Sequence, residues 1–162
     1  FAGLTSAYVV RANSGNWLVF NLPDIAILST AIIVTSSLTM FFAQRAVKRN
    51  NYRAVTTGLA LTLVLGAVFC YTQLEGWRQL TSQGIYFLGK YSNASGSFLY
   101  LIALVHILHL AGGLIAVGVS LVKSILKRYH AEDHLGLDLT AIYWHFLDLL
   151  WVYLFLFLYN YR

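Results

Sequence analysis

Four long runs of residues without charge limit what this chain can fold into. Three uncharged runs cover residues 25–44, 54–74 and 96–122, and a fourth run, residues 139–161, contains one charged side chain, Asp148. A helix of about 20 apolar residues is long enough to cross the hydrocarbon core of a bilayer. Charged residues make up 10% of the chain, whereas a soluble domain carries about 25%. The pattern predicts an all-α integral membrane helix bundle with four complete spans.

The ten residues at the start form a fifth apolar segment. Residues 1–10 are too short to cross a bilayer, and they predict the carboxyl-terminal stub of a first helix whose beginning lies upstream of Phe1. Residues 11–24 form a polar loop, and residues 75–95 form a loop rich in glycine, serine and aromatic residues. These connections leave no room for a soluble domain, so residues 1–162 are predicted to form a single transmembrane domain.

Lysine and arginine predict the orientation of the spans. Seven basic residues lie in two short loops after the second and fourth segments, and four lie on the other side. Loops rich in lysine and arginine stay in the cytoplasm, so the carboxyl terminus is expected in the periplasm. This distribution accounts for the net charge of +5 without a nucleic-acid partner. The seven are Arg45, Lys48, Arg49, Arg53, Lys123, Lys127 and Arg128.

Polar residues inside two of the spans are candidate site residues. His106 and His109 are three apart in one span, and His145 and Asp148 are three apart in the last, so each pair lies on one helical face. A carboxylate inside a bilayer is costly unless it is paired or protonated. At 1.5 Å per residue, Asp148 lies about 20 Å and His109 about 18 Å from the outer helix ends. We therefore expect Asp148 to hydrogen-bond His109, with His145 holding the same interface.

The residues leave four interpretations of this cluster open. Imidazoles suit zinc, copper and iron, so His106, His109 and His145 could bind a metal ion. Two of the histidines could instead ligate a haem, or the histidines and Asp148 could relay protons. The fourth interpretation is a buried hydrogen-bonded cluster that fixes how two helices pack.

A family resemblance narrows these interpretations. Residues 143–151 read Tyr-Trp-His-Phe-Leu-Asp-Leu-Leu-Trp, and residues 97–113 contain Ser-Phe-Leu-Tyr followed by His-Ile-Leu-His and Gly-Gly. Both segments resemble subunit III of the haem–copper oxygen reductases. Gln73, with Glu75 displaced by one residue, resembles a Gln-x-x-Glu-Tyr segment of that family, and residues 1–8 resemble the end of its third helix. The chain resembles a short five-span form of a subunit that usually has seven spans.

The resemblance implies a subunit with no catalytic, haem-binding or metal-binding residues of its own. Such a subunit packs on catalytic subunit I, beside subunit II, and supports proton uptake by an oxidase whose haems and copper lie in its partners. It implies a bacterial plasma membrane location and contacts with membrane phospholipid. Of the candidate residues, His106, His109, His145 and Asp148 then form a structural or proton-related cluster, with secondary roles for Gln73, Glu75, Trp144 and Trp151.

Two other functions remain open from the sequence. Within the family, the chain could be the matching subunit of a quinol oxidase or an accessory protein of a nitric oxide reductase. Outside it, the chain could be an independent haem-binding membrane cytochrome that uses two of its histidines.

Overall fold

The computed structural model describes residues 1–12, 25–82, 94–127, 129 and 134–160. These residues form five α-helices. No strand occurs in these ranges. Four of the helices are long and apolar enough to cross a membrane, which confirms the predicted all-α membrane bundle. The helices are α1 (Ala2–Ala12), α2 (Ile25–Val47), α3 (Tyr52–Ser82), α4 (Ala94–Ile125) and α5 (Leu135–Asn160).

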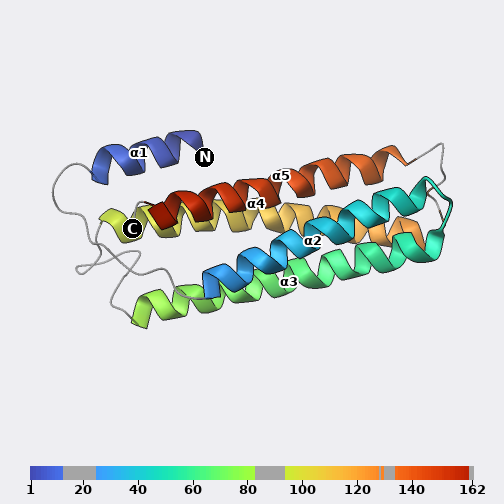
Figure 1. Cartoon of the computed structure of the whole chain (residues 1–162), viewed down its shortest axis with the longest axis horizontal. Helices are drawn as coiled ribbons and strands as arrows, with labels where there is room; N and C mark the ends of the chain where they lie inside the picture. The colour runs from blue at the N-terminus through green and yellow to red at the C-terminus, as the bar shows by residue number, and fades with distance from the viewer. Residues whose placement is uncertain (13–24, 83–93, 128, 130–133, 161–162) are drawn as a thin grey trace.

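The four long helices form an antiparallel bundle in which each helix packs on two others (Figure 1). α2 packs on α3 and α5, and α4 packs on the same two helices from the other side. α1 lies beside α4 at one end of the bundle. The ends of α2 and α4 and the starts of α3 and α5 lie at the opposite end (Figure 1), so the basic last turns of α2 and α4 share one end of the molecule.

The end of α3 differs from the prediction. The sequence predicted a loop from Glu75 onward, but α3 continues to Ser82. This last part of the helix is amphipathic: Leu80 is buried on one side, and the more exposed Glu75 and Arg78 form an ion pair of 3.2 Å one turn apart on the other. Neighbouring charges of opposite sign at this spacing stabilise a helix, so the charge at Glu75 did not mark the helix end.

The short connection between α2 and α3 follows from its asparagines. Asn50 has a positive φ of 52°, a conformation that asparagine adopts more readily than most residues. The Asn51 side chain then accepts a hydrogen bond from the Ala54 amide at 3.2 Å, which caps the start of α3. The result is a tight turn that returns the chain antiparallel along α2.

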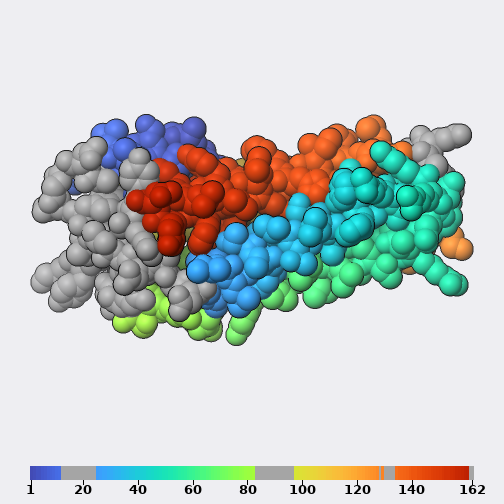
Figure 2. Space-filling view, viewed as in Figure 1, coloured from blue at the N-terminus to red at the C-terminus, as the bar shows by residue number. Residues whose placement is uncertain are grey.

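The surface of the bundle is apolar along the sides of its helices. Leu149 is 70% exposed and Ile115 is 69% exposed, values that suit contact with lipid or with a partner protein in the membrane. Figure 2 shows α2 and α5 lying side by side along much of the molecule. The core between the helices includes Ile33, Met40, Leu59, Phe69, Leu110, Trp144, Leu147 and Trp151.

Candidate functional site

The seam between α2 and α5 carries a series of polar contacts. The Trp144 indole donates a hydrogen bond to the Ser36 hydroxyl at 3.1 Å. His145 Nδ1 and the Ser37 hydroxyl lie 2.6 Å apart and share a hydrogen bond. Nearly two turns further along α5, the Trp151 indole donates to another hydroxyl of α2, that of Thr30, at 3.2 Å. Residues 143–151 therefore hold α5 to α2 by side chains, as well as by apolar packing.

Trp144 lies at the centre of the bundle, where two glycines make room for it. Its side chain is fully buried. A Cβ atom placed on Gly66 of α3 would lie 2.7 Å from Cη2 of the indole. A Cβ atom on Gly113 of α4 would lie 3.2 Å from its Cε3 atom. Trp144 thus contacts α2, α3 and α4 at one level, and no larger residue fits at Gly66 without displacing it.

His106 lies inside the bundle among aromatic rings. It is fully buried, and its ring centroid lies 5.1 Å from that of Trp151 and 6.2 Å from that of Phe69. Within the described part of the chain, neither ring nitrogen has a hydrogen-bond partner. An unpaired buried polar group costs about 1–3 kcal/mol, so the position of His106 is not explained by packing alone.

Asp148 is buried in the same core, and the prediction that it pairs with His109 is wrong. The Asp148 side chain is 4% exposed, and neither carboxyl oxygen accepts a hydrogen bond from any described residue. The Ser37 hydroxyl is hydrogen-bonded instead to His145 Nδ1 at 2.6 Å. Asp148 is therefore a second buried polar group without a hydrogen bond in the described structure.

His109 faces the surface of the bundle. Its ring is exposed, and its Nδ1 donates to the Val105 carbonyl oxygen of its own helix at 2.8 Å. Its backbone carbonyl accepts a hydrogen bond from the Tyr143 hydroxyl at 3.0 Å. Successive residues of a helix are 100° apart, so a residue three positions from the buried His106 lies about 60° round the helix. That rotation brings His109 to the surface although its depth matches that of Asp148.

The two secondary candidates on α3 have different environments. Glu75 is partly exposed and pairs with Arg78. Gln73 is 8% exposed and lies two residues earlier on the same helix. In the part of the chain that the structure describes, neither Glu75 nor Gln73 forms a hydrogen bond with a candidate histidine.

The candidate residues therefore do not converge on a single point. His106 faces the interior, His109 faces the surface, and His145 bonds Ser37. Among the residues that the structure describes, no three histidine, cysteine, aspartate or glutamate side chains are grouped as metal ligands would be. What the arrangement provides is a bundle tied together by indole–hydroxyl and imidazole–hydroxyl bonds, with two polar groups enclosed in its core.

The hydroxyl groups of α2 are the part of the site that the sequence interpretation missed. The hydroxyl groups of Thr30, Ser36 and Ser37 all bond residues of α5. Thr30 precedes the two adjacent serines by six and seven residues, which is about two turns of a helix. Other hydroxyl pairs join helices along the bundle. These pairs are Thr39–Thr62, Thr56–Ser124, Ser120–Thr140 and Thr5–Tyr153, with oxygen distances between 2.8 and 3.2 Å.

Comparison with known proteins identifies the family. Residues 17–162 match the family model described as cytochrome c oxidase subunit III. A probable cytochrome c oxidase subunit 3 of Nocardia farcinica is 32% identical over 168 aligned positions, which cover 100% of this chain and 81% of that protein. The cytochrome c oxidase subunit 3 of Spodoptera frugiperda is 29% identical, with 86% of this chain and 91% of that protein covered.

The length of the match varies among the relatives. The cytochrome c oxidase subunit 3 of Prototheca wickerhamii is 31% identical over 87% of this chain, but the chain spans only 52% of that protein. The family match nevertheless includes all of α2, α3, α4 and α5, and with them the segments 97–113 and 143–151; residues 1–8 lie outside it. This chain belongs to the cytochrome c oxidase subunit III family.

Proposed function

We propose that the chain is subunit III of a bacterial proton-pumping terminal oxidase of the cytochrome c oxidase type. The observation that carries this proposal is the family match over residues 17–162, which includes the whole four-helix bundle. The full coverage of the chain by the Nocardia farcinica relative supports the bacterial assignment. The complex would reduce oxygen to water while it moves protons across the membrane.

In this proposal the chain packs on catalytic subunit I, with subunit II and other subunits of the complex nearby. The side-chain bonds of the α2–α5 seam support a rigid scaffold with an apolar surface suited to a partner helix. The haems and copper belong to the partner subunits, and the candidate histidines lie in three separate environments rather than facing one centre. The subunit stabilises the catalytic subunit and supports its proton uptake, and phospholipid fills the remaining apolar surface.

The proposed location is the bacterial plasma membrane, with the carboxyl terminus in the periplasm. The last turns of α2 and α4, each with a basic residue, lie at one end of the bundle (Figure 1), and this end would face the cytoplasm. The carboxyl-terminal end of α5 and the end of α3 at Ser82 would then face the periplasm.

The test is to remove the chain and measure the oxidase that remains. Membranes from a deletion strain and from the complemented strain are compared for haem and copper content, initial oxygen consumption and loss of activity during turnover. We expect the deletion to retain the redox centres, to take up protons more slowly and to lose activity faster. Equal decay in the two strains would contradict the supporting role, and loss of the redox centres would place cofactor binding in this chain.

A further inference from the structure

Gln73 is a buried polar side chain that the proposed function does not use. It is 8% exposed and lies on α3, in the third of the helix that ends at Ser82. A glutamine amide has two hydrogens to donate and an oxygen that accepts. Within the described part of the chain, no side chain or backbone group hydrogen-bonds this amide. Its two donors and its acceptor are therefore available to a ligand in the adjoining cavity.

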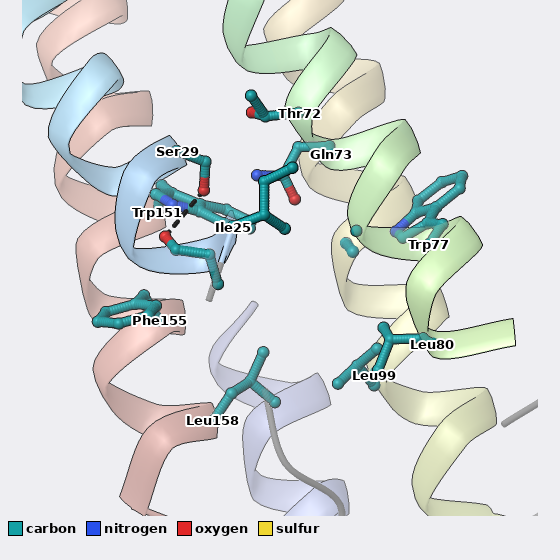
Figure 3. Close-up of a pocket in the computed structure, with 13 residues that line it drawn as sticks. Ile25, Ser29, Thr72, Gln73, Trp77, Leu80, Leu99, Trp151, Phe155 and Leu158 are labelled. Atoms are coloured by element: carbon teal, nitrogen blue, oxygen red, sulfur yellow. Dashed lines mark hydrogen bonds between the residues drawn. The ribbon is translucent and has the colours of Figure 1, made fainter. Parts of the chain in front are cut away.

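The Gln73 amide opens into a small cavity between the four long helices. The cavity volume is about 50 Å³. Figure 3 shows the Gln73 side chain extending from α3 toward Ser29 of α2 and Trp151 of α5. Below this polar part the walls are apolar, with Phe155 and Leu158 of α5 opposite Leu80 and Leu99 (Figure 3).

The hydroxyl groups beside Gln73 have already used their hydrogens. The Ser29 hydroxyl donates to the Ala26 carbonyl oxygen at 2.9 Å, and the Thr72 hydroxyl donates to the Phe69 carbonyl oxygen at 2.7 Å. Each hydroxyl oxygen can still accept a hydrogen bond. A ligand at this point must therefore accept a hydrogen from Gln73 Nε2 and donate hydrogens to oxygens of the wall, which is the hydrogen-bonding capacity of water.

We propose that this cavity is a water-binding site anchored by Gln73, with Ser29 and Thr72 as further partners. A buried water needs about 10–15 Å³ of such volume and two to four polar partners, so the cavity of about 50 Å³ has room for about three to five waters. A hydrocarbon chain would leave the amide unpaired. The inference concerns the interior of the chain itself and does not depend on the proposed oxidase role.

A single aromatic ring, that of Trp151, lies between the proposed water site and the buried His106. Trp151 lines the cavity, and its ring centroid lies 5.1 Å from that of His106. Thus the hydrated cavity and the unpaired imidazole lie against the same indole. The Trp151 N–H group already donates to Thr30. It is therefore not available to bond either the water or His106.

Hydroxyl-radical footprinting by X-ray radiolysis of the chain in its native membrane complex tests the site. Radicals formed from bound water oxidise the side chains that touch it. We expect oxidation of Trp151, which is 6% exposed, and of the cavity residue Phe155. Phe146, which is 58% exposed on the apolar surface, serves as the internal reference for a side chain away from bound water.

The variant Gln73→Leu keeps a side chain of similar volume and removes its polar atoms, without adding a sulfur that would itself react with the radicals. Oxidation of Trp151 and Phe155 should fall to the level of Phe146. Gln79→Leu, the same substitution nearly two turns along α3 and outside the cavity, should leave the oxidation of both residues unchanged. Unmodified Trp151 and Phe155 in the wild type, or equal oxidation in the two variants, would overturn the proposal.

If Gln73→Leu does not fold, a density map of the wild-type complex provides an independent test. We expect separate peaks within hydrogen-bonding distance of the Gln73 amide. An empty cavity, or continuous elongated density of an acyl chain, would contradict the water site.

Discussion

The contact between Gly66 and Trp144 gives a prediction whose size follows from the structure. In the variant Gly66→Ala the new Cβ atom would lie 2.7 Å from Cη2 of Trp144 and 2.8 Å from Cδ2 of Leu114. Trp144 is fully buried and bonded to Ser36 at 3.1 Å, so it cannot move away without losing that bond. Overpacking of a close-packed core typically costs about 1–3 kcal/mol.

Gly118→Ala is the matched control for this prediction. Gly118 lies in the neighbouring span α4, and no atom lies within 4 Å of a Cβ placed there. Replacing glycine by alanine in a helix is favourable by about 1 kcal/mol, and this gain is common to both variants. The difference between their free energies of unfolding therefore isolates the packing cost at Gly66, and we expect Gly66→Ala to be less stable by about 1–3 kcal/mol.

The assay is unfolding of the purified chain in mixed detergent micelles by titration with a denaturing detergent. Far-ultraviolet circular dichroism follows the loss of helix and does not depend on the environment of Trp144. Two variants with the same free energy of unfolding would refute the conclusion that Gly66 is needed for the close approach of α3 to the indole.

Three further predictions concern Asp148, the α2–α5 seam and the orientation of the chain. Because the Asp148 carboxyl group is buried without a hydrogen bond to any described residue, Asp148→Leu should raise the free energy of unfolding; a lower value would mean that the group has a stabilising partner. His145→Ala and Ser37→Ala each remove the 2.6 Å bond, and a double-mutant cycle should give a coupling of about 0.6 kcal/mol; zero coupling would contradict the bond. In a background without the native cysteine, an impermeant thiol reagent should label Lys48→Cys from the cytoplasm and Asn160→Cys from the periplasm. The reverse labelling pattern would invert the topology.

The positions of the spans could be predicted from the sequence because the bilayer sets them. A run without charge must be about 20 residues long to cross the hydrocarbon core, and α2 begins at Ile25 as the uncharged run does. The end of α3 could not be predicted in this way. Glu75 and Arg78 interrupt the uncharged run, but they pair on the exposed side of a helix that continues to Ser82.

The depth of the buried polar residues could be predicted, but their rotation about the helix axis could not. The rise per residue placed His109 and Asp148 at similar depths. Which side of α4 faces the core depends on packing: the rings of Phe69 and Trp151 enclose His106, so His109 is turned to the surface. Sequence spacing relates the two histidines to each other and does not say which of them lies inside.

The hydroxyl partners on α2 could not be predicted for a related reason. A serine or threonine in a helix can bond a carbonyl oxygen of its own preceding turn, as Thr30 does with Ala26 at 2.8 Å. The sequence does not indicate whether such a hydroxyl group also accepts a hydrogen bond from another helix. Only the packing of α5 on α2 brings the Trp151 indole to the Thr30 hydroxyl.

Purification of the native assembly tests the central claim, that this chain works as subunit III of an oxidase. An affinity-tagged chain is extracted from its own membranes in a mild detergent, and the associated proteins and optical spectrum are determined. The account predicts co-purification with a catalytic subunit that carries haem and copper, and no haem absorbance once the chain is separated from it. A chain that purifies without such a partner, or that keeps a stoichiometric Soret band of its own after separation, would contradict the account.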